Sequence, residues 1–212
     1  GGSRSYLGPL TKPFRDRIRT RARVVSLRRI DDGVVLRVDG EPERHFDAAV
    51  VAAHSDQALR LLADPSDAEA DVLGAIPYQQ NDVVLHTDTA LLPRRRRAWA
   101  AWNYHLPAVP SQRATVTYCM NILQGLPGPE TYNVTLNSTE AIDPRRVLRR
   151  FVYDHPVFDQ RGVAAQARVR ELSGSRRVWF CGAWCGFGFH EDAVQAGLAV
   201  ARDFALAEEP VA

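Results

Sequence analysis

Short apolar runs alternate with polar residues over positions 23–53. The segments RVVSLRRI, VVLRV and HFDAAVVAA are joined by short turns, and the first turn ends in Asp32-Gly33, a pair that favours a β-hairpin. This pattern predicts a β-meander. Residues 48–53 are apolar throughout, which is typical of an interior parallel strand covered on both faces.

Two helical patterns follow this strand. The segment QALRLLAD places its apolar residues on one helical face, and Pro65 ends that helix. Ser66, with Glu69 three residues later, forms the capping box of a second helix. The neighbouring acids Asp56 and Asp67 therefore need no functional explanation.

The C-terminal part predicts two further helices and a strand. We expect a helix over residues 144–154 (PRRVLRRFVYD), a polar stretch containing Gly162, a strand over 178–180 (VWF), and a helix that opens at Glu191. Gly197 lies inside this last helix, where glycine costs about 1 kcal/mol relative to alanine. We therefore expect another segment to pack closely against Gly197.

The middle of the chain has a different pattern, which predicts strands. The β-rich segments DVVLHTD, RAWAAWNYHL, TVTYCMNIL and YNVTLN are separated by proline, glycine and serine, as in an antiparallel sheet. The expected fold class is α+β (mixed α/β), with two domains. Residues 1–75 and 160–212 form one of them, and residues 76–159 form a second domain around the antiparallel sheet.

Composition narrows the function classes. The 212 residues are 45% hydrophobic and 25% charged, enough for one large or two small globular domains. The formal net charge is only +2, which argues against a nucleic-acid surface. No apolar run is long enough for a membrane span and the first residues do not resemble a secretory signal, so we expect a cytoplasmic protein that is not transmembrane. Gly1 in place of methionine fits either an expression remnant or a cut through a longer protein.

The cysteines and histidines give no metal-binding spacing. Cys181 and Cys185 are four residues apart with no second pair, so we interpret them, with Cys119, as reduced core thiols and expect no metal. An imidazole can act as an acid or a base near neutral pH in general. A structural role is nevertheless the simpler interpretation for five of the six histidines, namely His54, His86, His105, His155 and His190.

The segment FCGAWCGFGFHEDAVQAG, residues 180–197, raises a functional question. Its three loop glycines allow a backbone to pass close to a flat ligand, and Glu191 and Asp192 lie in the first turn of the following helix, where carboxylates complement the helix dipole. A plain packing corner between strand, turn and helix accounts for the local pattern equally well.

The longer segment RVWFCGAWCGFGFHEDAVQAGLAVARDF resembles the C-terminal flavin-binding signature of the flavin-containing amine oxidase superfamily. The matching positions are Cys181-Gly182, Glu191, Ala193, Ala196 and Gly197. The segments VVAAHSDQAL, VVLHTD, AWAAWNY, YDHPVFD and GFGFHED are similar, more specifically, to bacterial amine-oxidase-like FAD/NAD-binding proteins of unassigned substrate. The resemblance covers nearly the whole chain.

The resemblance implies part of a Rossmann-like FAD domain with a β-meander, plus an antiparallel-sheet substrate domain. It implies backbone N–H groups at the last helix's start directed at the flavin N1–C2=O edge, an aromatic Phe189 facing the ring, and Val24 meeting the adenine. The implied cofactor-binding residues are Val24, Ala53, Gly182, Ala183, Gly188, Phe189, Glu191, Asp192 and Ala193. Candidates for the flavin-facing wall of the substrate domain are Trp99, Trp102, Asn103 and Tyr104.

Two departures from the family pattern matter. Amine oxidases commonly hold a lysine near the reactive edge of the flavin, and the only lysine here, Lys12, does not match that position. No Gly-x-Gly-x-x-Gly motif cradles a pyrophosphate. The chain therefore resembles the C-terminal half of a flavoprotein whose N-terminal FAD-binding half is missing, and we expect it alone to bind FAD weakly or not at all.

The leading hypothesis is a fragment of a flavin-dependent oxidoreductase that oxidises a C–N or C–C bond by hydride transfer to FAD. Its aromatic segments favour an apolar, lipid-like small-molecule substrate, and its weak catalytic candidates are His190, Trp102 and Asn103. Expected partners are the missing half and a second copy of the chain, joined through exposed sheet edges. The alternative is a non-catalytic binding or interaction module that kept the fold and lost the cofactor.

Overall fold

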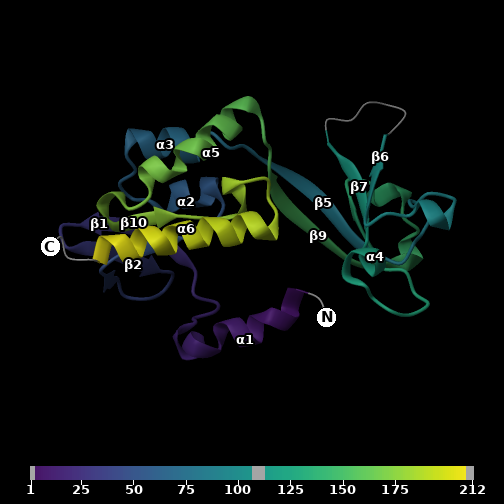
Figure 1. Cartoon of the computed structure of the whole chain (residues 1–212), viewed down its shortest axis with the longest axis horizontal. Coiled ribbons are helices and arrows are strands. Elements are labelled where there is room, and N and C mark those ends of the chain that lie inside the picture. Colours follow the sequence, from purple (N-terminus) through teal and green to yellow (C-terminus); the bar gives the residue numbers. More distant parts are fainter. Residues whose placement is uncertain (1–2, 107–112, 209–212) are drawn as a thin grey trace. The chain divides into compact units, whose positions relative to one another are not determined.

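The computed structural model describes residues 3–106 and 113–208. The chain divides into two compact units. Unit 1 comprises Gly1–Ile18 and Gln79–His155, and unit 2 comprises Arg19–Tyr78 and Pro156–Ala212. Figure 1 shows the helices and strands of both.

Unit 2 contains the predicted meander. Strands β1 (Val24–Ile30), β2 (Gly33–Val38) and β3 (Arg44–Phe46) form an antiparallel sheet in the order β1-β2-β3. Ile30 faces Gly33 across a two-residue turn, which confirms the hairpin. The third apolar run is split, because only its first part joins the meander.

The second part of that run is β4 (Ala49–Val51), which pairs in parallel with β10 (Val178–Phe180). The predicted parallel pairing is confirmed, although the strand is shorter than residues 48–53. The expected cover on both faces is not found in the described residues, where Val50 is 49% exposed. Among the described residues this sheet has only two strands, in contrast to the larger, covered sheets in which parallel strands usually occur.

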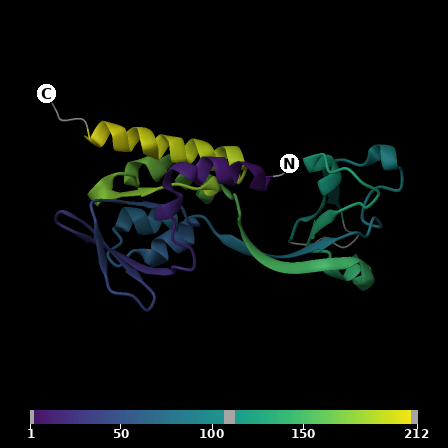
Figure 2. The same ribbon diagram turned by 90° about the horizontal axis from the view of Figure 1, so that it is seen from below.

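Helices cover both faces of β10. On one face, Trp179 packs against Val200 and Phe204 of α6 (His190–Glu208), with the Trp179 and Phe204 ring centroids 4.8 Å apart. Figure 2 shows α6, in yellow, along one side of this unit. On the other face, Val178 and Phe180 enter the main core with α2 (Ser55–Leu61), α3 (Asp67–Leu73) and α5 (Gln160–Leu172).

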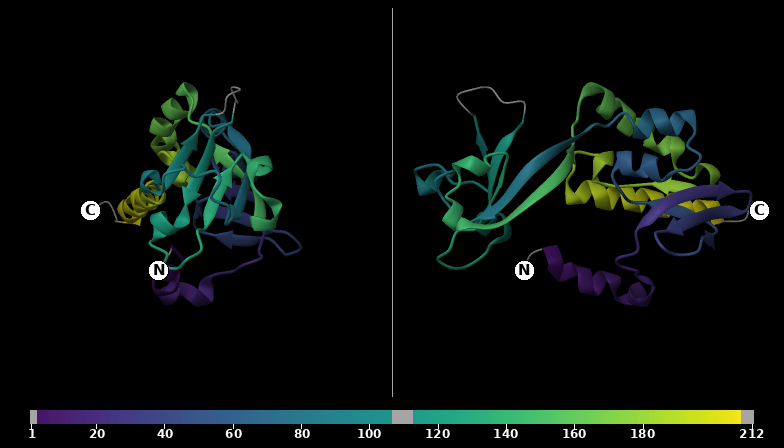
Figure 3. Two further views of the ribbon diagram at one scale, coloured as in Figure 1. Left: turned by 90° about the vertical axis from the view of Figure 1, so that its right-hand side faces the viewer. Right: turned by 180° about the vertical axis from the view of Figure 1, so that it is seen from behind.

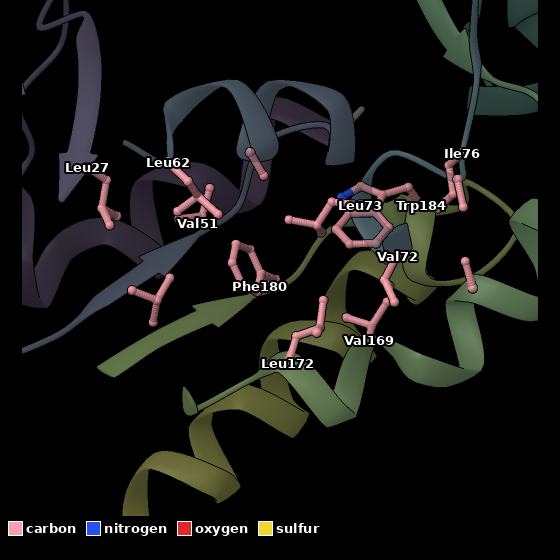
Figure 4. Packing of buried hydrophobic residues seen from close by; sticks show 14 of the residues in the cluster. Leu27, Val51, Leu62, Val72, Leu73, Ile76, Val169, Leu172, Phe180 and Trp184 are labelled. Carbon is pink, nitrogen blue, oxygen red and sulfur yellow. The ribbon is translucent and has the colours of Figure 1, made fainter. Parts of the chain in front are cut away.

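Phe180 lies at the centre of this core, surrounded by aliphatic side chains (Figure 4). It is 2% exposed, and burying such a side chain contributes about 1.5–3 kcal/mol. Its labelled neighbours in the cluster are Leu27, Val51, Leu62, Val72, Leu73, Ile76, Val169, Leu172 and Trp184.

The capping box at the start of α3 is confirmed. The Ser66 hydroxyl accepts from the Glu69 N–H, and the Glu69 carboxylate accepts from the Ser66 N–H. The same carboxylate pairs with Arg29 of β1, and both side chains are almost fully buried. A local helix signal thus also anchors the meander to α3.

Unit 1 is built on a five-stranded sheet of order β6-β7-β8-β5-β9 (Figure 3). The strands are β5 (Tyr78–His86), β6 (Trp102–His105), β7 (Thr115–Cys119), β8 (Asn133–Leu136) and β9 (Val147–Pro156). The antiparallel pairing of β6, β7, β8 and β5 confirms the predicted sheet. Short helices complete the unit: η1 (Ser3–Tyr6), α1 (Leu7–Thr11), η2 (Lys12–Arg17), η3 (Arg96–Ala98), α4 (Met120–Gln124), η4 (Thr139–Ala141) and η5 (Pro144–Arg146).

The helix predicted over residues 144–154 is wrong. Pro144 begins only the single 3₁₀ turn η5, after which the chain extends as β9 beside β5. Pairing with a strand distant in sequence overrides the local helix preference. The polar stretch around Gly162, for which no helix was predicted, contains α5. The start of α5 is capped by the Asp159 carboxylate, which accepts from the Gly162 N–H at 2.7 Å.

The close packing expected at Gly197 is also wrong for the described part of the chain. Nothing lies within 4 Å of the position that a Cβ there would occupy. Instead, Gly197 borders an apolar groove of about 460 Å³ between α6 and Val50. No helix in the described residues is long and apolar enough to cross a bilayer.

Candidate functional site

The glycine-rich loop lies at the carboxyl end of the parallel strands. β10 ends at Phe180, and the loop runs through η7 (Ala183–Cys185) to the start of α6. The Trp184 indole N–H donates to the carbonyl oxygen of Ala53, just beyond β4, at 2.8 Å. In open α/β sheets, ligands bind outside the carboxyl ends of the strands. The loop is therefore in the position of a ligand site.

Helix α5 holds the loop from a second direction. The Gln166 side-chain amide donates to the carbonyl oxygens of Trp184 and Gly186, at 2.9 and 2.6 Å. Trp184 itself is buried in the main core. Gln166 could not be predicted from the sequence, because no local motif marks a contact between residues 18 or more positions apart.

Asp192 closes the loop from the helix side. Its Oδ2 atom accepts hydrogen bonds from the backbone N–H groups of Phe187 and Phe189, at 3.0 and 2.9 Å. A Cβ at Gly186 would lie 2.4 Å from Asp192 Oδ1, so only glycine allows this approach. Glu191 instead accepts from the Gln195 side-chain amide at 2.6 Å. The two acids therefore have different roles, and Asp192 acts as the cap that orders the loop.

The ordered loop presents aromatic rings to solvent. Phe187 is 65% exposed and Phe189 is 51% exposed, on either side of Gly188. Gly188 has a φ of +89°, a backbone conformation that favours glycine. Val194 and Leu198 add exposed apolar surface one and two turns into α6. These exposed apolar side chains beside a fixed backbone make the loop a candidate binding surface.

The two cysteines beside the loop are free thiols, Cys181 buried and Cys185 partly buried. All three are free, and burial raises the pKa of the Cys185 thiol to about 12, with Cys181 adding to the rise. Burial also raises the pKa of Cys181. Because the thiolate is the reactive form, neither residue is suited to nucleophilic or redox chemistry near neutral pH.

The structure divides the predicted site residues between the two units. Unit 2 brings together, around the loop, Ala53, Gly182, Ala183, Gly188, Phe189, His190, Glu191, Asp192 and Ala193. Val24 lies in the same unit, at the start of β1. Trp102 and Asn103 lie on β6 in unit 1.

Asn103 is occupied by backbone contacts. Its amide donates to the carbonyl oxygens of Ala100 and Thr117, at 2.7 and 3.2 Å, and its Oδ1 accepts from the Ala100 N–H at 3.1 Å. These bonds hold the turn before β6 and leave the side chain buried. Trp102, by contrast, is half exposed and lies edge-on to Tyr118.

One face of the unit 1 sheet carries a buried chain of hydrogen bonds. His86 Nε2 lies 2.8 Å from Thr135 Oγ1, Thr135 lies 2.8 Å from Thr117 Oγ1, and Thr117 lies 3.1 Å from His105 Nε2. The Asp88 N–H donates to His86 Nδ1, so a neutral His86 donates from Nε2 into the chain. Burial lowers the pKa of His86, although Asp88 opposes this. This chain of hydrogen bonds gives His86 and His105 a structural role.

The other face of the sheet is apolar and aromatic. The register places Trp102 opposite Tyr118 and Tyr104 opposite Val116, and continues to Val134 and Leu136 on β8. Trp102 and Tyr104 are 50% and 63% exposed. Unit 1 therefore has an accessible apolar surface, separate from its polar interior.

A family model described as flavin containing amine oxidoreductase matches residues 9–97. No curated protein sequence matches the chain. Wild-type putrescine oxidase bound to putrescine superposes with a TM-score of 0.65 at 11% identity, covering 93% of this chain and 51% of that one. Cyclohexylamine oxidase from Brevibacterium oxydans IH-35A gives 0.63 at 15% identity, covering 99% and 54%. The CLA-producing fatty acid isomerase from P. acnes gives 0.56 at 15% identity, covering 86% and 47%.

The fold is therefore that of the flavin amine oxidases, a mixed α+β architecture. The family model matches fewer than half of the residues, and the likeness to these solved structures is one of fold. The chain spans about half the length of these solved structures.

The loop residues fit a flavin ring. Gly188 offers a backbone without a side chain, the exposed ring of Phe189 offers flat apolar surface, and the start of α6 offers the positive end of a helix dipole. The sequence contains no glycine-rich phosphate loop. The fit is thus to the isoalloxazine ring rather than to the pyrophosphate.

Proposed function

We propose that this chain forms the C-terminal part of an FAD-dependent oxidoreductase that oxidises a C–N or C–C bond. When bound, FAD supplies the hydride acceptor at its N5 atom. The observation that carries the proposal is the loop after β10, which is held by Trp184, Gln166 and Asp192 and presents Phe189 outward. Preorganised loops of this kind hold ligands without a cost for ordering.

In this proposal the chain's own residues bind and orient. The ring of Phe189 and the backbone at Gly188 contact one face of the flavin. The start of α6 carries partial positive charge and would stabilise negative charge at the N1–C2=O edge. The Ala193 N–H is already bonded to the Phe189 carbonyl, at 3.3 Å, so the contribution would come from the helix end as a whole. Ala53 and Gly182 would border the cofactor, and Val24 would hold the adenine.

The phosphates require a partner. Because no Gly-x-Gly-x-x-Gly motif is present, we assign the pyrophosphate to an N-terminal FAD-binding half that pairs with the β4–β10 sheet. Parallel strands rarely occur as an isolated pair, which supports a further strand at this edge. The isolated chain is then expected to bind FAD weakly or not at all.

The aromatic face of the unit 1 sheet supports an apolar, lipid-like substrate. Trp102, Tyr104 and Tyr118 provide flat apolar surface. Their cross-strand neighbours on this face are Val116, Val134 and Leu136, so no charged residue is among these pairs. The names of the similar structures include amine oxidases, in keeping with oxidation of a C–N bond, and a fatty acid isomerase, in keeping with a lipid-like substrate. We place the reaction in the cytoplasm.

The test compares Phe189→Ala with the matched control Phe187→Ala in the full-length, flavin-loaded protein. Both rings are exposed, but Phe187 packs edge-on against Phe158 with centroids 5.9 Å apart. We expect Phe189→Ala to shift the flavin absorbance bands and the reduction potential, and Phe187→Ala to leave both unchanged. Unchanged absorbance and turnover in Phe189→Ala would discard the assigned role. A full-length protein that purifies without flavin would favour the non-catalytic module.

A further inference from the structure

The outer strand β9 of the unit 1 sheet is unusually long and exposed. It spans ten residues, Val147–Pro156, and within the described part of the chain it has a neighbour, β5, on one side only. Leu148, Val152 and Tyr153 are 53%, 57% and 50% exposed. A long edge strand with exposed apolar residues is a template for pairing with another strand.

Its side chains are already ordered along one face. The Arg149 guanidinium lies over the Phe151 ring, 5.4 Å from the centroid. Phe151 stacks on Tyr153 with centroids 5.4 Å apart and an interplanar angle of 13°. A strand that enters an interface with its side chains already ordered loses less conformational entropy.

The sequence of β9 is complementary to itself. Phe151 and Tyr153 are equally spaced about Val152, and so are Arg150 and Asp154. Among the residues that the structure describes, neither Arg150 nor Asp154 has an ion-pair partner. In an antiparallel pair centred on Val152, each arginine would face the aspartate of the other strand, and each Phe151 would face a Tyr153.

We propose that β9 pairs with β9 of a second copy of this chain, antiparallel and about a two-fold axis at Val152. The two five-stranded sheets then become one continuous sheet across an interface in which both copies use the same surface. Centring the pair on Arg150 would oppose two guanidinium groups, and centring it on Asp154 would oppose two carboxylates. Charge therefore selects the Val152 register.

This proposal does not depend on the proposed function. Charged residues on an edge strand often prevent pairing, and that is the competing explanation for Arg150 and Asp154. The two explanations predict opposite results. Removing a charge that prevents strand pairing would strengthen the dimer, whereas removing a charge that forms an ion pair across the two strands would weaken it.

The first experiment tests the register by cross-linking the 212-residue chain. Val152→Cys should form a disulfide-linked dimer under mild oxidation, since the two thiols meet at the axis. Leu148→Cys is the matched control, on the same face and similarly exposed, but about 27 Å from its own counterpart in this register. The Leu148→Cys variant should remain unlinked. The unsubstituted chain should also remain unlinked, which would show that the native cysteines do not form the cross-link. Equal cross-linking at both positions would overturn the register.

The second experiment measures the dimer dissociation constant by sedimentation equilibrium. Arg150→Asp should raise it at least tenfold, and the double variant Arg150→Asp with Asp154→Arg should restore it. Arg37→Asp, at an exposed position on β2, controls for net charge. Circular dichroism checks that each variant is folded. A chain that stays monomeric at all concentrations, or a dimer unaffected by Arg150→Asp, would overturn the proposal.

Discussion

Replacing Asp192 with alanine tests how the candidate flavin loop is held. The carboxylate accepts two backbone hydrogen bonds, from Phe187 and Phe189. A hydrogen bond to a charged group contributes about 1.5–3 kcal/mol, and the partial exposure of Asp192 reduces this. We therefore expect Asp192→Ala to cost about 1–3 kcal/mol in the free energy of opening the loop.

Hydrogen exchange measures this free energy directly. The amides of Phe187 and Phe189 should exchange about 5- to 150-fold faster in Asp192→Ala, because each 1.4 kcal/mol is a factor of ten. Asp192→Asn, which keeps an acceptor oxygen, should recover part of the protection. Asp203→Ala removes an exposed carboxylate from the same helix and should change nothing at the loop. Unchanged exchange in Asp192→Ala would refute this account of the loop.

Three further predictions concern other buried groups. Glu69→Ala leaves a buried arginine without its closest partner, and should cost about 3–5 kcal/mol by chemical denaturation, whereas Glu41→Ala at an exposed ion pair should cost under about 1 kcal/mol. Thr135→Val removes the hydroxyl that links His86 to Thr117, and should lower the free energy of unfolding by about 1–3 kcal/mol, measured by heat or denaturant. An unchanged free energy of unfolding would contradict the role of this hydrogen-bond chain. The pKa of Cys185 is raised to about 12 in the folded protein, so its alkylation at pH 8 should be about 10³-fold slower than that of a free cysteine. For the same reason, its contribution to the unfolding free energy should be lost as the pH rises from about 8.5 to 12, and rapid alkylation at pH 8 would contradict the burial.

The elements that the sequence predicted correctly have local causes. The hairpin depends on the two-residue turn at residues 31–32 before Gly33, and the start of α3 depends on Ser66 and Glu69, three residues apart. Each of these two signals lies within a few neighbouring residues. The parallel strand β4 was predicted because apolar residues on both faces require cover on both sides.

The errors and omissions have non-local causes. The segment Val147–Pro156 is a strand because β5 lies beside it, although its own residues also suit a helix. The bond from Trp184 to Ala53 joins residues 131 positions apart, and no spacing rule could predict it. Asp192 was predicted to complement the helix dipole, but its hydrogen bonds to the loop depend on a backbone path that only the fold defines. Of the candidate site, the sequence could predict the residues but not how they are held.

The most direct test of the central claim is an NMR titration of the ¹⁵N-labelled 212-residue chain with FAD. The account predicts no stoichiometric complex at micromolar concentrations, and places any amide shifts at higher FAD concentrations in residues 182–193. A tight one-to-one complex, or shifts that lie elsewhere and spare these residues, would contradict it.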